Sequence, residues 1–382
     1  MIVYVITKLE LGGAQKVCLE LVRGVDDHMP TALISGQHGA LVPAAKSLPR
    51  AFLLPSLQRE VRLLGFVHDA RTFFAIWRLL RQLKKEHKYM VVHTHSTKAG
   101  IIGRWAAWSA GIKQRVHTIH GYSFHDYLPW YTWLAHYQIE WLTSLITTHF
   151  VCVSEKDRQT GIRLFPRFAQ KSSIIRAAVD AKKLGDQSFI PAYRADKPLV
   201  IGTIACFKPQ KNLLDLLQAF QRVHAALLGQ GQPAPKLEII GDGQQRAIIE
   251  TWLQQHHLTE AVRLLGWQND VQPFLQQWDI FALTSLWEGL PCSVVEARLS
   301  KLPVVAYDVG GIREIIKHGQ NGFLIQPGEW QDVADKILTL TQDPALYRSL
   351  AHFTDDLTDF DNNTMVKKHA TLYNSLLSIK PE

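Results

Sequence analysis

The chain has 382 residues, of which 47% are hydrophobic and 20% charged, a composition that excludes a disordered chain and suits two folded domains. No apolar run reaches the roughly 18 residues of a membrane-spanning helix, and Met1–Ile6 is too short, with no basic residue before it, for a secretory signal. Because the four cysteines are scattered, they argue against a disulfide scaffold, and we expect a protein of the reducing cytoplasm.

The charge is unevenly distributed along the chain. Residues 1–190 hold 25 basic and 13 acidic side chains, and residues 191–382 hold 17 and 21, so the halves carry net charges of +12 and −4. A basic half suits nucleic acid, an anionic membrane or a phosphorylated substrate, and it is also compatible with a solvated surface. Since no nucleic-acid recognition motif is present, we expect no nucleic-acid partner.

Short apolar runs alternate with helix-length segments, which predicts parallel sheets covered by helices on both faces. The predicted strands of the first half are Ile2–Ile6, Thr31–Ile34, Met90–Val92, Arg115–Thr118 and Phe150–Val153. Those of the second half are Leu199–Ile204, Leu237–Ile240, Val262–Leu265, Ile280–Leu283 and Val304–Ala306. The helices between the latter are expected at Leu213–Leu228, Gln244–Gln255, Val271–Gln276, Ser293–Ser300 and Ile312–Lys317.

The predicted fold class is therefore α/β, with two doubly wound Rossmann-like domains. The periodicity breaks over Asp186–Pro198, which predicts one domain over residues 1–188 and a second over 189–357. Met365–Leu377 reads as a terminal helix. Ligands of such folds bind beyond the carboxyl ends of the strands, so the cleft between two such domains is the expected active site.

Three strand-to-helix loops carry residues that suit an anionic ligand. Gly12 and Gly13 follow the first strand and allow close approach of backbone N–H groups, although many such turns use glycine for geometry alone. Lys208 and Lys211 follow Leu199–Ile204, where two ammonium groups suit a diphosphate and a solvated loop is the alternative. Gly241 follows the next strand, in a turn that also permits close approach.

The segment from Glu288 to Glu296 gives the strongest signal. Its two carboxylates bracket a Gly289-Leu290-Pro291 turn that opens a helix, whose amides and dipole favour an anion. Carboxylates placed in this way suit sugar and ribose hydroxyls. The alternative is a helix capped by Glu296 beside an exposed Glu288.

With these motifs the chain resembles the family-four retaining glycosyltransferases of the GT-B fold. The resemblance rests on Ser285–Glu296 and on further segments in the same order, which span nearly the whole chain. These are Gly12-Gly13-Ala14, His93–Gly100, Val116–Gly121, Lys211-Asn212, Gly241-Asp242-Gly243, Pro303–Ala306, Val309–Glu314 and Asn321–Leu324.

The resemblance implies transfer of a sugar from a nucleotide-sugar donor, most often a UDP-sugar, to a glycan or lipid-linked acceptor in cell-surface polysaccharide or lipopolysaccharide synthesis. It implies retention of the anomer, no metal, no cofactor, and a helix over about 358–382 that packs back on the first domain. The alternative is a sugar-nucleotide epimerase of the same two-domain shape.

The resemblance also assigns roles to individual residues. Glu288 would contact the donor sugar, Glu296 the ribose and Lys211 the diphosphate, while the Gly289–Pro291 amides would support the sugar. Gly266 and Trp267 would line the base pocket, and His120 would sit beside the reacting carbon. The family usually has an arginine five residues before this lysine, where the chain has Cys206. Because a neutral thiol cannot stabilise a leaving diphosphate, we expect Lys208 to supply that charge.

Two patterns could indicate a metal. The pairs His93/His95 and His117/His120 consist of a residue type that binds zinc, but no cysteine or carboxylate at ligand spacing accompanies them. We therefore expect these histidines to line a polar wall of the cleft. Asp359-Phe360-Asp361 is similar to a metal-binding Asp-x-Asp, yet it lies in the last segment, where we expect solvated acids.

Residues 68–88 form a basic amphipathic pattern, which suits either a helix packed on its sheet or a contact with an anionic membrane at the inner face of the plasma membrane. A nearby stretch is rich in aromatic residues that we expect to be exposed, in an acceptor groove or in lipid headgroups. They are Tyr127, Trp130, Tyr131, Trp133, Tyr137 and Trp141.

Overall fold

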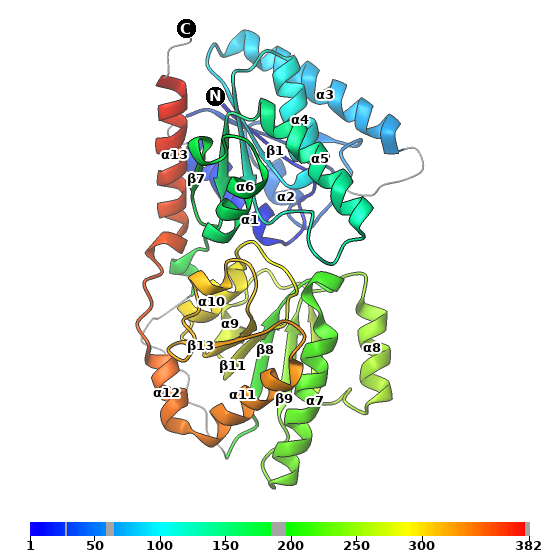
Figure 1. Ribbon diagram of the computed structural model, residues 1–382, viewed down its shortest axis with the longest axis vertical. Coiled ribbons are helices and arrows are strands. Elements are labelled where there is room, and N and C mark those ends of the chain that lie inside the picture. The colour runs from blue at the N-terminus through cyan, green and yellow to red at the C-terminus, as the bar shows by residue number, and fades with distance from the viewer. Residues whose placement is uncertain (27–28, 59–64, 185–195, 379–382) are drawn as a thin grey trace. The chain divides into compact units, whose positions relative to one another are not determined.

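The computed structural model describes residues 1–26, 29–58, 65–184 and 196–378. The chain divides into two units, each a parallel sheet with helices on its faces (Figure 1). Unit 1 comprises Met1–Ala178 and Asp359–Glu382, and unit 2 comprises Val179–Thr358. The boundary predicted between residues 188 and 189 lies outside the described residues.

Unit 1 has a seven-stranded parallel sheet in the order β3-β2-β1-β4-β5-β6-β7. The strands are β1 (Ile2–Ile6), β2 (Thr31–Gly36), β3 (Ala51–Leu54), β4 (Val91–His95), β5 (Gln114–Ile119), β6 (His149–Cys152) and β7 (Ser172–Ile174). The helices are α1 (Gly13–Asp26), α2 (Val42–Lys46), α3 (Gly65–Glu86), α4 (Thr97–Ser109), α5 (Trp130–Ile146), α6 (Glu155–Leu164) and α13 (Asn362–Ser378), with 3₁₀ turns at Ala169–Lys171 and Thr358–Phe360. Every residue of β1, β2 and β4 is buried, as their continuous apolar runs predict.

Unit 2 has a six-stranded parallel sheet in the order β10-β9-β8-β11-β12-β13. Its strands are β8 (Val200–Ile204), β9 (Lys236–Ile240), β10 (Val262–Gly266), β11 (Ile280–Leu283), β12 (Val304–Tyr307) and β13 (Gly322–Ile325). Its helices are α7 (Leu213–Gly229), α8 (Arg246–Gln255), α9 (Gln272–Leu275), α10 (Cys292–Leu299), α11 (Trp330–Gln342) and α12 (Pro344–His352), with 3₁₀ turns at Ala181–Leu184, Pro209–Lys211 and Ile312–Glu314. The predicted α/β class with two doubly wound sheets is confirmed.

Helices cover both faces of the unit 1 sheet. The terminal helix α13 packs against α1 on one face, and α4 lies between α3 and α5 on the other (Figure 1). Tyr373 of α13 reaches the sheet, where its hydroxyl lies 2.5 Å from Nδ1 of His93 on β4. The last helix of the chain is thus part of the unit formed by the first 178 residues.

Two local expectations need correction. Ile312–Lys317 is a single 3₁₀ turn over Ile312–Glu314 rather than a helix, because Asn321 folds back and accepts a hydrogen bond from the Lys317 amide. The strands β3, β7 and β13 lie at sheet edges and were not predicted, since their short runs include half-buried or small polar residues. Over the part of the chain that the structure describes, every helix is too short or too polar to cross a bilayer.

Candidate functional site

The loop that follows β8 brings Lys211 to Glu288. Lys211 ends the 3₁₀ turn Pro209–Lys211, and its ammonium forms an ion pair and hydrogen bond with Oε1 of Glu288. The exposed fractions of these two side chains are 14% and 8%. The pair is therefore largely withdrawn from water, and the alternative of an exposed Glu288 is wrong.

Backbone contacts fix the Glu288 segment in place. Gln210 donates from Nε2 to the Trp287 carbonyl at 2.7 Å, and the Leu286 amide donates to the Gln210 carbonyl at 2.8 Å. Gly310 has φ of +56°, and a Cβ at this position would collide with the Glu288 carbonyl. Gly310 is thus a glycine because the backbone of the Glu288 turn passes against it. The pattern Val309-Gly310-Gly311 thus supports the backbone of the Glu288 turn.

The electrostatics of the site favour a charged Lys211. Burial alone would lower the pKa of Lys211, but the carboxylate of Glu288 and the thiols of Cys206 and Cys292 outweigh burial, so the pKa is raised above its ordinary value. The ammonium keeps its proton at neutral pH and can be shared with a second anion.

Helix α10 begins at Cys292, directly after the Gly289-Leu290-Pro291 turn. Its N-cap residue, Pro291, has no side chain that could accept a hydrogen bond from the first turn. Gly289, Leu290 and Pro291 are buried, and Glu296 lies half-buried in the second turn of the helix. Glu288 and Glu296 therefore stand on either side of a helix start, which has the positive potential that an anionic ligand requires.

The remaining predicted donor residues of unit 2 lie at the carboxyl ends of neighbouring strands. Lys208 is half-buried in the loop after β8, and Gly241 follows β9 with φ of +132°, where a Cβ would collide with the Ala205 carbonyl. Gly266 ends β10, and Trp267 after it is 42% exposed. These loops follow β8, β9 and β10, which are adjacent in the sheet, so they share one edge with the Lys211 loop.

In unit 1 the predicted residues follow β1 and β5. Gly12 precedes α1 and Gly13 is its first residue, and both are at least partly exposed. His120 directly follows β5, and its Nε2 lies 2.9 Å from Nδ1 of His95, the last residue of β4. Burial lowers the pKa of His120 to about 3, so its imidazole is neutral at physiological pH.

The other histidines of this region do not form the polar cleft wall that the sequence suggests. His93, His95 and His117 are buried in the core of unit 1. His93 bonds to Tyr373 at Nδ1 and to Thr118 at Nε2 (2.7 Å), and His117 bonds to Thr94 at 2.9 Å. A histidine can occupy a core when it is neutral and hydrogen-bonded. The spacing of the histidines in the sequence does not show whether such hydrogen-bond partners are present.

The His pairs and the Asp359-Phe360-Asp361 segment have other partners in the structure. Within the described residues, no three His, Cys, Asp or Glu side chains are grouped so that they could hold a metal ion. Asp359 pairs with Lys368 at 2.6 Å, and Asp361 accepts the amides of Asn363 and Thr364 at the start of α13. Asp361 thus acts as a helix cap.

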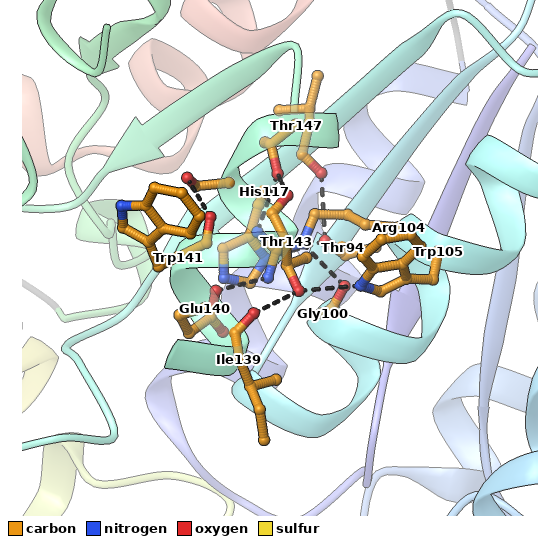
Figure 2. A network of polar contacts seen from close by, with 12 residues as sticks. Thr94, Gly100, Arg104, Trp105, His117, Ile139, Glu140, Trp141, Thr143 and Thr147 are labelled. Atoms are coloured by element: carbon orange, nitrogen blue, oxygen red, sulfur yellow. Dashed lines mark hydrogen bonds and ion pairs between the residues drawn. The ribbon is translucent and has the colours of Figure 1, made fainter. Parts of the chain in front are cut away.

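A buried ion pair that the sequence did not suggest lies beneath α5 (Figure 2). Arg104 of α4 is fully buried and donates from Nη2 to Glu140 of α5 at 2.9 Å, from Nη1 to Thr147 at 3.0 Å and from Nε to the Gly100 carbonyl at 2.8 Å. Both charged residues fall among apolar neighbours in the sequence, so only their pairing in space explains them. A small pocket beside this pair is lined in part by Thr97, His117, Ser123 and Glu140.

Comparison with known proteins gives two family matches in chain order. The family described as "Glycosyltransferase Family 4" matches residues 11–183, and "Glycosyl transferases group 1" matches residues 187–354. The UDP-Gal:alpha-D-GlcNAc-diphosphoundecaprenol alpha-1,3-galactosyltransferase of Escherichia coli is 29% identical over 349 residues, which are 88% of this chain and 86% of that protein. The putative glycosyltransferase EpsD of Bacillus subtilis is 29% identical over 72% of this chain and 74% of its own.

Solved structures agree on the fold. Alr3699/HepE of Anabaena in complex with UDP-glucose has a TM-score of 0.77 at 20% identity, covering 98% of this chain and 99% of that one. Sucrose-phosphate synthase from Thermosynechococcus elongatus has a TM-score of 0.79 at 16% identity and covers 98% of both chains.

Proposed function

This chain is a glycosyltransferase that belongs to family four and has the GT-B fold, and from that premise we propose that it transfers a sugar from a UDP-sugar to a lipid-linked glycan acceptor. The product belongs to bacterial surface polysaccharide or lipopolysaccharide synthesis. The observation that carries the proposal is the buried Lys211–Glu288 pair beside the start of α10, in loops at one edge of the unit 2 sheet. The name of the Escherichia coli galactosyltransferase and the complex of Alr3699/HepE with UDP-glucose support UDP as the nucleotide.

The donor site is assembled from unit 2. The Lys211 ammonium and the first amides of α10 stabilise the negative charge that grows on the diphosphate as the anomeric bond breaks. Glu288 accepts hydrogen bonds from sugar hydroxyls and holds Lys211 charged, and Glu296 accepts those of the ribose. Gly241, Gly266 and Trp267 border the nucleotide, and the Gly289–Pro291 turn supports the sugar.

Unit 1 supplies the acceptor side. The residues of this unit that we assign to a sugar substrate are Gly12 and Gly13, which offer backbone amides, and neutral His120, which offers one hydrogen bond. The anomer is retained when the acceptor hydroxyl attacks from the face that the diphosphate leaves, and the leaving phosphate can take the proton. Because the acceptor is lipid-linked, the enzyme works in the cytoplasm, bound peripherally to the inner face of the plasma membrane.

The direct test is release of the nucleoside diphosphate, UDP or GDP, from a panel of UDP- and GDP-sugars. It is measured with and without a diphosphoundecaprenol-linked sugar as acceptor, and with and without a chelator. We expect UDP release that depends on the acceptor and is unchanged by the chelator. An epimerase would convert the donor without any acceptor, and that result would overturn the proposal.

We predict that Lys208→Ala lowers kcat about tenfold. With Cys206 in the place of the usual arginine, the loop has Lys208 as its second cation, and a charge-assisted contact to the diphosphate contributes about that factor. The control is Lys236→Ala, an exposed cation at the start of β9. Steady-state kinetics with varied donor check this, and an unchanged kcat and donor KM for the Lys208 variant would contradict it.

For Glu296→Ala we predict a 10- to 100-fold increase in the donor KM, about the value of hydrogen bonds to a charged group, with a smaller change in kcat. The ribose is unaltered in the transition state, so this contact stabilises ground state and transition state alike. Glu260→Ala, at an exposed position of unit 2, serves as the control. Equal losses in kcat and kcat/KM would show instead that Glu296 acts on the reacting bond.

A further inference from the structure

Helix α5 buries polar side chains and exposes apolar ones. Its buried residues are the polar Glu140, Thr143 and Ser144. Its exposed large side chains are all apolar or aromatic: Trp130 (76%), Tyr131 (62%), Leu134 (38%), Ile139 (45%), Trp141 (38%), Leu142 (52%) and Leu145 (54%). A surface helix of a globular domain normally has the opposite arrangement.

Hydrogen bonds and ion pairs fix this orientation (Figure 2). Arg104 of α4 holds Glu140 at 2.9 Å and Thr147 at 3.0 Å, and Trp105 of α4 donates to Thr143 at 3.0 Å. Trp133 and Tyr137, expected to be exposed, instead pack on the cluster around Phe124 and Phe165. The helix therefore cannot turn its apolar face inward without breaking a buried ion pair.

No charged side chain interrupts the exposed face. Among the exposed positions of α5, Gln138 is the single polar residue. Trp108 of the neighbouring helix α4, which is 51% exposed, extends the apolar surface. We call this surface, made of the seven exposed α5 side chains named above together with Trp108, the α5 face. Apolar surfaces of this extent mark a contact with protein or membrane rather than with water.

Helix α3 packs on α4, which in turn packs on α5 (Figure 1), and α3 carries exposed cations. Its inner face, including Ile76, Leu80 and Leu83, is buried in the core, so α3 cannot insert into lipid as the sequence pattern allowed. Its outer face exposes one acid, Glu86, and five cations: Arg71, Arg78, Arg81, Lys84 and Lys85. The arrangement is an uncharged aromatic surface with a basic ridge beside it.

We propose that the α5 face inserts into the headgroup region of an anionic lipid bilayer while the α3 cations pair with lipid phosphates. This inference rests on the proposed function, because a lipid-linked acceptor must be met at a membrane. Trp and Tyr partition to the boundary between water and hydrocarbon, Leu and Ile to its apolar side, and Arg and Lys to anionic headgroups.

The basic ridge favours a bilayer over a second copy of the chain. A symmetric pair of α5 faces would bring two like-charged α3 ridges to the same interface, which costs free energy in a dimer. An anionic membrane offers the complementary charge to both helices at once.

Vesicle flotation tests the proposal with three variants and two lipid compositions. The α5 variant carries Trp130→Gln, Leu142→Gln and Leu145→Gln, and the α3 variant carries Arg71→Gln, Arg78→Gln and Lys85→Gln. The control carries Leu228→Gln and Ile248→Gln, exposed apolar positions of unit 2. The vesicles are equal parts phosphatidylethanolamine and phosphatidylglycerol, or phosphatidylcholine alone.

We expect the wild type and control to float with the anionic vesicles and the α5 variant to bind about tenfold or more weakly. The α3 variant should lose only its preference for anionic lipid. Brominated lipids should quench the tryptophan fluorescence of the wild type, and they should quench that of a Trp130→Phe variant less. This conservative substitution tests the position of Trp130 without destabilising the fold. Wild-type binding by the α5 variant overturns the proposal, as does a dimer that this variant converts to a monomer with unchanged flotation.

Calorimetry with UDP on the wild type separates the two proposals. If the protein binds UDP but does not float with the vesicles, the proposed membrane contact of the α5 face is wrong and the proposed function is unaffected. Protein that floats without binding UDP contradicts the proposed function and leaves the surface standing.

Discussion

Lys211→Ala is expected to lower kcat/KM for the UDP-sugar about 10²–10³-fold, the effect of removing one preorganised charge from a transition state. The Lys211 side chain is 14% exposed and its ammonium is already held by Glu288, so it needs little reorganisation when a diphosphate arrives. The diphosphate gains charge as the anomeric bond breaks, so the loss should fall on kcat more than on donor KM. Steady-state kinetics and UDP titration together measure the two parts.

The same substitution leaves the 8% exposed Glu288 carboxylate without its cation, which itself costs stability. Lys211→Ala combined with Glu288→Gln removes both charges and serves as the stability control. If the double variant recovers the melting temperature, the unpaired Glu288 carboxylate accounts for the instability of Lys211→Ala. The activity of Lys211→Ala is then measured at a temperature well below its own melting temperature, where an activity loss is a defect in catalysis. A Lys211→Ala variant with less than a threefold loss in kcat/KM would remove the diphosphate role from this residue.

Acid should unfold unit 1 in a narrow range below pH 6.5. Burial, reinforced by neighbouring histidines, lowers the pKa of His93, His95 and His117 well below the ordinary value. Burial likewise lowers the pKa of His120 to about 3 and of His369 to about 4. The native protein therefore keeps these imidazoles neutral where the unfolded chain, with pKa about 6.5, binds protons.

The sign of the effect follows from proton binding. Above pH 6.5 the histidines are neutral in both states and contribute no pH dependence. As the pH falls below 6.5, each costs about 1.4 kcal/mol of unfolding free energy per pH unit until its native pKa is reached. Because several such groups act together and a typical domain is stable by only about 5–15 kcal/mol, the stability of unit 1 should fall steeply as the pH drops below 6.5.

Thermal melts by circular dichroism between pH 7.5 and 4.5 check this expectation. His369→Gln should make the fall in melting temperature less steep, because one proton fewer is taken up on unfolding. His38→Gln, at an exposed position of the same unit, should leave the slope as in the wild type. A melting temperature that stays level down to pH 4.5 would contradict the account of a neutral histidine cluster.

The alternation of apolar runs and helix-length segments was enough to predict the fold class and most strands. This worked because strands such as β1 and β4 are buried on both faces and leave an unbroken apolar signal. It failed at the edge strand β7, where half-buried serines resemble a loop. It also failed at Ile312–Glu314, where a side-chain contact from Asn321 ends the turn.

The site shows the same division between local and spatial information. Glycines, lysines and acids after strands identified the loops, because carboxyl ends of parallel strands share one edge. The pairing of Lys211 with Glu288, 77 positions apart, and of Arg104 with Glu140 depends on which strands and helices become neighbours. For helix α5 the sequence predicted exposed aromatic side chains, and Trp130 and Tyr131 are exposed. It did not predict that Trp133 and Tyr137 pack inward, or that Glu140 is buried against Arg104.

The measurement that tests the central claim most directly is a crystal structure of the protein with a bound UDP-sugar. The account predicts diphosphate oxygens within hydrogen-bond distance of Nζ of Lys211 and of the first amides of α10, with the ribose hydroxyls at Glu296. Density for the nucleotide elsewhere on the protein, with the Lys211–Glu288 pair facing only solvent, would contradict it.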